Sequence, residues 1–137
     1  MAYVFNDDKS KRKIDDGLNI DTGWVDLTLT DNVEEYTTGG HNKPQYRRIG
    51  NVVYVKGTVT TKASFIANQR IDISTIPLEL APQFPTYIQK DIEQGASGKI
   101  VLDHSGNSAT PPDLVAFPSS NISSGTMLGI YFSYPIG

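Results

Sequence analysis

Apolar and polar residues alternate with a period of two along much of this chain, and this alternation restricts it to β-structure. In residues 126–134, the side chains of Leu128, Ile130, Phe132 and Tyr134 fall on one face of an extended strand. No window of about eleven residues shows the i, i+3, i+4, i+7 spacing of an amphipathic helix. About seven short segments, punctuated by Pro and Gly, predict a single all-β domain built as an antiparallel β-sandwich or jelly roll.

The expected strands follow from the same alternation. Residues 51–61 are rich in β-branched side chains and carry apolar residues on both faces near their start, which predicts one central strand. Residues 23–30 place three apolar side chains on the face opposite Trp24, which predicts a half-buried strand. Turn-forming and polar residues fill residues 31–44, which predicts a long loop. Further strands are expected in residues 70–76, 99–103, 114–117 and 126–134, with residues 87–92 as a strand or a helical turn.

The first part of the chain differs from the rest in composition. Residues 6–22 carry many charged side chains around few apolar ones, so burial there offsets little of the entropy lost on ordering. We therefore expect an N-terminal arm or linker over residues 1–22, either docked on a neighbouring subunit or frayed. The remaining residues, 23–137, are of a size that fits one β-domain.

Charge and hydropathy exclude several classes of partner. The 12 basic and 15 acidic residues give a net charge of −3, so there is no positive field to attract nucleic acid or an anionic membrane. No apolar run reaches the length of a membrane span, and the N-terminus does not resemble a signal peptide. Synthesis in the cytoplasm without membrane insertion is expected. The absence of cysteine excludes disulfides and thiolate chemistry.

No motif in the sequence supports catalysis or a bound cofactor. His41 and His104 are far apart and belong to no metal-binding pattern. The carboxylate pairs at 15–16 and 34–35 consist of adjacent residues, which point to opposite faces of a strand and cannot flank a glycosidic bond. Residues 15–21 offer oxygen ligands but fail the EF-hand pattern. We expect no enzyme activity, no metal and no cofactor.

The remaining functional signal is a supply of aromatic rings close to amides and carboxylates. Saccharide recognition requires a ring that stacks on the sugar and polar groups that take up its hydroxyl hydrogen bonds. Trp24 is the only tryptophan, and it serves either such a site or the packing of its strand. The candidate saccharide-binding residues are Trp24, Tyr36, Tyr87, Asp103, His104 and Asn107, with Tyr46, Tyr131 and Gln89 as further possibilities.

The order of several motifs resembles a known family. The segments GWVDLTLT, YRRIGNVVYVKGTVT, IDISTIPLELAPQFP and SGKIVLDHSGN follow one another as in the head domains of tail-fibre and baseplate receptor-binding proteins from phages, or prophages, of Gram-positive bacteria. The opening MAYVFNDDKSK is similar to the start of small tail and baseplate proteins of such phages. Ile76 stands where the family more often has Leu, and no coiled-coil stem precedes the head.

This resemblance implies a β-sandwich or jelly-roll head that forms a homotrimer in the virion tail or baseplate. It implies reversible binding of bacterial cell-wall polysaccharide, without cleavage, and contacts with other tail or baseplate subunits. Two alternatives remain open at this stage: a structural accessory subunit without a ligand site, and a cell-wall hydrolase. Apolar side chains close to the C-terminus favour an oligomer, because a monomer would have to cover them alone. They are Tyr131, Phe132, Tyr134 and Ile136.

Overall fold

The computed structural model describes residues 20–36, 43–107 and 109–136. These residues form antiparallel β-sheets and one 3-10 turn, η1 (Leu78–Leu80), so the expected all-β class is confirmed. The first sheet has the order β1 (Val25–Asp26), β3 (Gln45–Ile49), β4 (Val52–Lys56), β11 (Phe132–Pro135). The second has the order β10 (Met127–Gly129), β5 (Thr58–Thr61), β2 (Val33–Glu35). The third has the order β6 (Ile71–Thr75), β9 (Asp113–Pro118), β8 (Gly98–His104), β7 (Thr86–Asp91).

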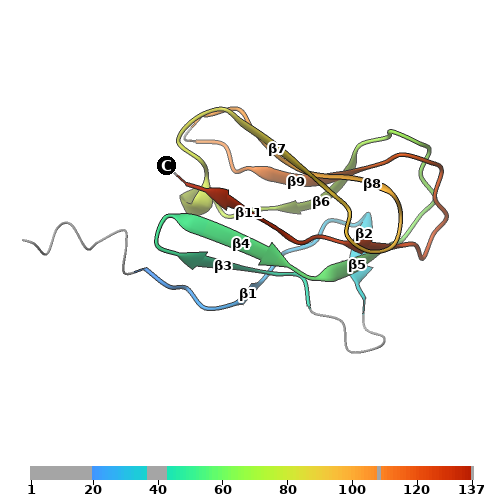
Figure 1. The fold of residues 1–137 in the computed structure, drawn as a ribbon, viewed down its shortest axis with the longest axis horizontal. Helices are drawn as coiled ribbons and strands as arrows, with labels where there is room; N and C mark the ends of the chain where they lie inside the picture. The colour runs from blue at the N-terminus through green and yellow to red at the C-terminus, as the bar shows by residue number, and fades with distance from the viewer. Residues whose placement is uncertain (1–19, 37–42, 108, 137) are drawn as a thin grey trace, which may run out of the picture.

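The sheets stack in two layers (Figure 1). The β6-β9-β8-β7 sheet forms the upper layer in that view, and the β1-β3-β4-β11 sheet lies below it. The short β10-β5-β2 sheet continues the lower layer, since β4 leads into β5 and β10 leads into β11. This arrangement is a sandwich, as the alternation of apolar residues predicted.

The lower layer bends where two long segments, which pair with each other, pass from one sheet to the next. One segment forms β4 and β5, and the other forms β10 and β11. The sequence predicted single strands over residues 51–61 and 126–134, but each is divided into two. Gly57 lies at the first break, with a φ of +131° that favours glycine. A Cβ at this position would lie 2.4 Å from the Pro44 Cα. Pairing continues through the bend, because the Ile130 N–H donates to the Gly57 carbonyl at 2.9 Å.

The core lies between the layers and follows the predicted alternation. Leu128, Ile130, Phe132 and Tyr134 are all buried, as expected for one face of an extended segment. The Tyr134 hydroxyl donates to the Leu80 carbonyl at 2.9 Å, which joins β11 to the turn η1. Burial raises the pKa of Tyr134 well above its ordinary value.

The first described segment departs from two expectations. The strand predicted over residues 23–30 is limited to β1, although Leu27 is buried as predicted. The chain then leaves β3 and crosses to β6, where Leu29 bridges Ser74. Residues 31–44 were expected to be a loop, but they include β2, which pairs with β5. Tertiary pairing therefore overrides the weak local signal there.

Part of the expected N-terminal arm belongs to the sheet. Asp21 bridges Ile49, and the Thr22 N–H donates to the Arg48 carbonyl at 3.0 Å. Residues 1–19 lie outside the described residues, as does His41, so the expectations for these positions stay untested.

Two of the four apolar residues near the C-terminus do not support an oligomer, because the domain buries them itself. Phe132 and Tyr134 are 8% and 1% exposed and belong to the domain's own core. Their hydrophobicity is therefore explained within one chain. The homotrimer stays a prediction that rests on the family resemblance.

The close approach at Gly57 gives a test of the bend. Gly57→Ala is expected to lower the free energy of unfolding by more than about 3 kcal/mol, because the new methyl meets backbone atoms that cannot move aside. Gly125 is the matched control, since it also has a positive φ, of +85°, but no atom lies within 4 Å of its Cβ position. Gly125→Ala should cost about 1–2 kcal/mol, from backbone strain alone. Urea denaturation measures both values, and equal losses would contradict a steric requirement at the bend.

Candidate functional site

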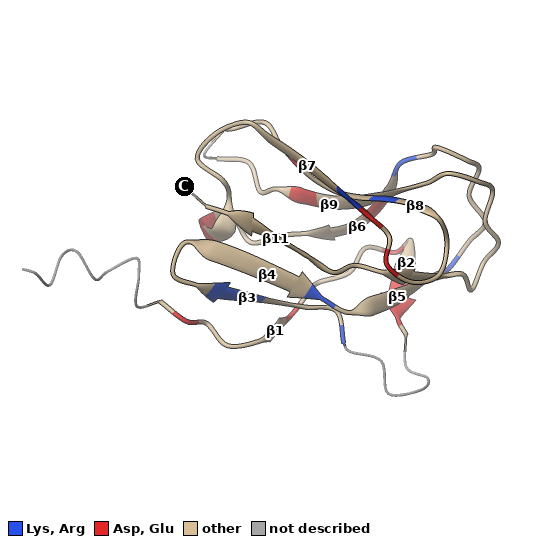
Figure 2. Cartoon of the chain, viewed as in Figure 1, with Lys and Arg blue, Asp and Glu red and all other residues tan. Residues whose placement is uncertain are grey.

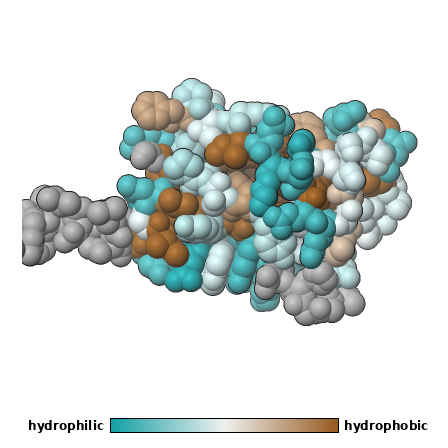
Figure 3. Space-filling view, in the orientation of Figure 1, coloured by the Kyte–Doolittle hydropathy of each residue, from teal (hydrophilic) through white to brown (hydrophobic). Residues whose placement is uncertain are grey.

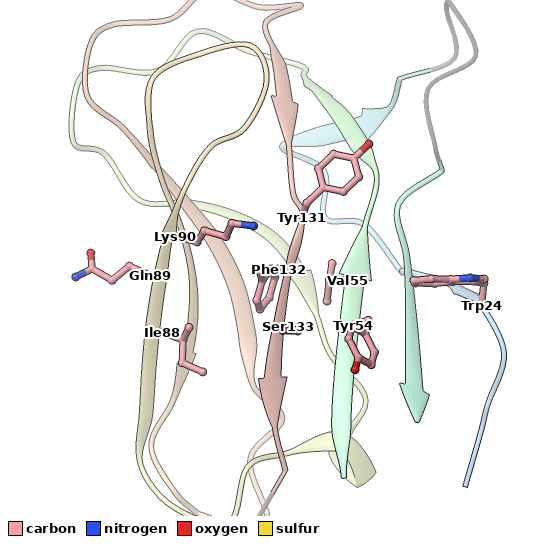
Figure 4. Close-up of a pocket in the computed structure, with 9 residues that line it drawn as sticks. All are labelled: Trp24, Tyr54, Val55, Ile88, Gln89, Lys90, Tyr131, Phe132 and Ser133. Carbon is pink, nitrogen blue, oxygen red and sulfur yellow. The ribbon is translucent and has the colours of Figure 1, made fainter. Parts of the chain in front are cut away.

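An open groove of about 470 Å³ extends from the edge strands β7 and β11 across β4 to Trp24. In Figure 1, β7 lies above β11 and β4, the strands that carry most of the lining residues. The space-filling view in the same orientation shows apolar residues in the middle of the molecule, with hydrophilic residues beside them (Figure 3). The lining residues are shown in Figure 4: Trp24, Tyr54, Val55, Ile88, Gln89, Lys90, Tyr131, Phe132 and Ser133.

The groove exists because β7 and β11 separate between two points of backbone contact. The Gly129 N–H donates to the Gln94 carbonyl at 3.0 Å, and the Gln83 N–H donates to the Ile136 carbonyl at 2.9 Å. These bonds join the two layers just beyond the ends of β7 and β11. Between them, each strand is the edge of its own sheet. The groove is thus an opening in a seam that is closed at both ends.

Four aromatic residues line the groove, and three of them are partly exposed. Trp24, just before β1, and Tyr54, on β4, are each 40% exposed. Tyr131, just before β11, is half-buried. Val55 and Phe132 also line the groove, but they alternate with the exposed residues along β4 and β11 and belong to the buried core. The lining therefore combines partly exposed rings with the margin of the core.

Two cations position the indole ring of Trp24. The Lys56 Nζ lies 4.2 Å from the ring centroid, and the Arg47 Cζ lies 5.8 Å from it. Positive charges are attracted to the electron-rich face of an indole. Figure 2 shows the basic residues of β3 and of the end of β4 that supply these charges. The ring is therefore held over the sheet while much of it stays accessible.

Polar groups in the groove come from both borders. The Lys90 ammonium points toward Tyr131 and Phe132 in Figure 4, and it pairs with Glu93 at 2.6 Å. Ser133 on β11 adds an exposed hydroxyl. The Gln89 amide points away from the other lining residues, so this residue borders the groove with its stem and backbone. The groove can exchange hydrogen bonds with a polar ligand at its centre.

The predicted site residues do not form one cluster. Trp24 lines the groove, whereas Tyr87 and Asp103 lie opposite each other in the β7–β8 register. Ile88, between Tyr87 and Gln89, packs against the core, which places Tyr87 on the outer face of the upper layer. Tyr87 is 57% exposed there.

An ionic cluster occupies that outer face beside Asp103. The Arg70 guanidinium contacts the carboxylates of Asp72, Asp103 and Asp113 at 3.0, 2.9 and 3.3 Å. Burial raises the pKa of Asp113, while the positive charge of Arg70 acts in the opposite direction. The Asp103 carboxylate thus already has a cationic partner.

The other predicted residues lie in tightly bonded local structure. His104 is 4% exposed, and its ring is held between the Gly106 N–H at 3.1 Å and the Thr110 carbonyl at 2.8 Å. Asn107 accepts a hydrogen bond from the Ala109 N–H at 2.9 Å. Tyr36, after β2, is half-buried, and its N–H donates to the Thr58 carbonyl at 3.1 Å. These contacts give His104 and Asn107 a role in shaping the turn that follows β8.

Several groove residues escaped the sequence analysis. Tyr54 lies inside a run of valines, where it appeared to be part of a central strand, and Lys90 and Ser133 belong to no motif. Only the approach of β7 and β11, which are distant in sequence, brings these residues together. A local pattern contains no signal for such a contact.

The described residues contain neither a cluster of metal-ligating side chains nor a long apolar helix. Among residues 20–36, 43–107 and 109–136, no group of three or more His, Cys, Asp or Glu side chains is placed to hold a metal ion. In the same part of the chain, no helix has the length and apolar character that crossing a membrane requires.

Comparison with solved structures relates this fold to the head domain of a phage receptor-binding protein. No protein-family model matches the sequence, and no curated protein matches it either. Among solved structures, the chain is similar to the head domain of phage bIL170, a receptor-binding domain of a lactococcal phage. The TM-score is 0.54 and the identity is 19%, with 84% of this chain and 98% of that chain covered.

The chain has the fold of a phage receptor-binding head domain. The resemblance expected from the motif order is therefore confirmed at the level of the fold. Since the two sequences are only 19% identical, the comparison assigns no individual binding residue to this chain.

The ion pair beside Trp24 gives a test of the local electrostatics. Arg47 donates to both Asp21 carboxylate oxygens, at 2.9 and 2.7 Å. This contact, with a smaller effect of the hydrogen bond from the Gly23 N–H, lowers the Asp21 pKa from 3.8 to about 2. Because the folded-state pKa is depressed, the pair stabilises the fold above pH 3.8 and loses this contribution as the pH falls toward 2. Titration of the Asp21 carboxyl by NMR should give a pKa near 2 in the native chain and a higher pKa in Arg47→Ala, where the hydrogen bond from the Gly23 N–H remains.

Arg48→Ala is the control for that titration. Arg48 also lies on β3, but its Nε donates to the Gly50 carbonyl at 2.7 Å. The Asp21 pKa should therefore stay low in Arg48→Ala. An ordinary Asp21 pKa in the native chain would show that the ion pair does not form in solution.

Proposed function

We propose that this chain is a non-enzymatic receptor-binding head that acts on a phage tail or baseplate and binds a saccharide of the bacterial surface. The groove between β7 and β11, lined by four aromatic residues on the fold of a phage receptor-binding head domain, supports this proposal. The proposal includes the homotrimer and the contacts with other tail or baseplate subunits that the family resemblance implies.

The chemistry of the groove matches that of a saccharide. A sugar ring has apolar C–H faces that pack against aromatic side chains, and hydroxyls that need hydrogen-bond partners when they leave water. Trp24, Tyr54 and Tyr131 supply the rings, and Lys90 and Ser133 supply polar groups. The volume of about 470 Å³ lies in the range usual for ligand sites.

The positions of the rings favour a chain of sugars over a single unit. β3 separates β1 from β4 in the sheet, so β1, which Trp24 immediately precedes, and β4, which carries Tyr54, lie about 10 Å apart. Rings at that separation can stack on different units of one saccharide. A site of this kind suits reversible attachment to a surface polymer.

The outer face with Tyr87 and Asp103 is the competing binding site. It combines an exposed ring with a carboxylate on the neighbouring strand. Arg70 already pairs with that carboxylate at 2.9 Å, so a sugar hydroxyl would have to displace or share this contact. The groove combines a concave opening of about 470 Å³ with several aromatic rings, which is why we place the saccharide there.

Truncation of the Trp24 ring tests both the function and the site. On an array of bacterial surface polysaccharides, the native chain is expected to bind, and Trp24→Ala should weaken binding about tenfold or more, since a stacked ring is lost. Phe84→Ala is the matched control, because Phe84 is 70% exposed but does not line the groove. Its affinity should be that of the native chain.

Three outcomes of this experiment would contradict the proposal. Absence of binding to every polysaccharide would favour a purely structural subunit. A loss in Tyr87→Ala but not in Trp24→Ala would move the site to the outer face of the upper layer. Shortening of the bound polysaccharide during incubation would show an enzyme.

A further inference from the structure

The backbone of β11 alternates between the sheet and the groove. The Ile130 N–H donates to the Gly57 carbonyl at 2.9 Å, and the Ile136 N–H donates to the Asn51 carbonyl at 2.8 Å. In an antiparallel pair, residues that exchange hydrogen bonds with the partner strand alternate with residues that do not. The N–H groups of the even-numbered residues from 130 to 136 therefore face β4. The backbone N–H and carbonyl groups of Tyr131 and Ser133 point away from it.

These outward groups belong to the groove. β11 is the last strand of its sheet, and both Tyr131 and Ser133 line the groove. Each presents one N–H and one carbonyl, and the two sets lie about 7 Å apart along the strand. The next outward residue is Pro135, which has no N–H to offer.

We propose that the backbone N–H and carbonyl groups of Tyr131 and Ser133 bind saccharide hydroxyls directly. This inference rests on the proposed function and assigns further ligand groups to the same site. A hydroxyl both donates and accepts a hydrogen bond, so an N–H and a carbonyl side by side match its chemistry. The edge of the strand then supplies polar contacts next to the aromatic rings.

The dimensions of the open edge favour a saccharide over an added β-strand. Only two residues offer outward groups before Pro135, and proline at an edge prevents further pairing. The bonds Gly129 N–H to Gln94 and Gln83 N–H to Ile136 close the seam beyond each end of the opening. An added strand of ordinary length would collide with both closures, whereas a short run of sugars fits between them.

Amide hydrogen exchange, measured by NMR, tests this assignment. The probe is a soluble oligosaccharide released from the array polysaccharide that binds the native chain most tightly. The amides of Tyr131 and Ser133 should exchange fast in the free protein and about tenfold or more slowly with the oligosaccharide bound. Phe132 and Tyr134, whose amides face β4, are internal controls and should change little.

A pair of variants at position 133 separates the backbone from the side chain. Ser133→Pro removes the outward N–H without removing a bond to β4, and it should weaken oligosaccharide binding about fivefold or more. Ser133→Ala keeps the N–H and removes only the side-chain hydroxyl, so it should weaken binding clearly less than Ser133→Pro does. If Ser133→Pro fails to fold, the exchange measurement on the native chain decides the question.

The possible failures are distinguishable. If no polysaccharide binds, the proposed function fails and this inference fails with it. If the oligosaccharide binds but the two amides stay unprotected, or Ser133→Ala weakens binding as much as Ser133→Pro, only the inference is overturned. Protection of both amides in the free protein that rises with protein concentration would show that a second copy occupies the edge, which also overturns it.

Discussion

The antiparallel pairing of β4 and β5 with β10 and β11 is the constraint on which the rest of the structure depends. It runs through both sheets of the lower layer and continues across the bend at Gly57, where Ile130 donates to the glycine carbonyl. This pairing places alternate residues of the C-terminal segment in the core. It also makes β11 an edge strand, because no further strand of that sheet lies beyond it.

The groove is a consequence of that edge. The chain brings β7 alongside β11 and joins the two layers by backbone hydrogen bonds beyond both ends, but the strands stay apart between those points. The lining combines the buried side chains of Val55 and Phe132 with partly exposed rings and polar groups. The proposed saccharide site therefore depends on the same separation that leaves a sheet edge unpaired.

The sequence predicted what depends on local alternation and missed what depends on distant contacts. The buried face of Leu128, Ile130, Phe132 and Tyr134 was predicted because period-two alternation needs no knowledge of the partner strand. The break at Gly57 was missed because it is imposed by the approach of Pro44 from another segment. β2 was missed because it contains one apolar residue among charged ones. For the groove, Trp24 was one of the candidates and does line it, whereas Tyr54, Lys90 and Ser133 reach the lining only because β7 and β11 come together.

A crystal structure of the chain with a bound oligosaccharide would test the central claim most directly. The account predicts sugar density in the groove between β7 and β11, in contact with the Trp24 ring. Density on the outer face of the upper layer, beside Tyr87 and Asp103, with the groove empty would contradict it.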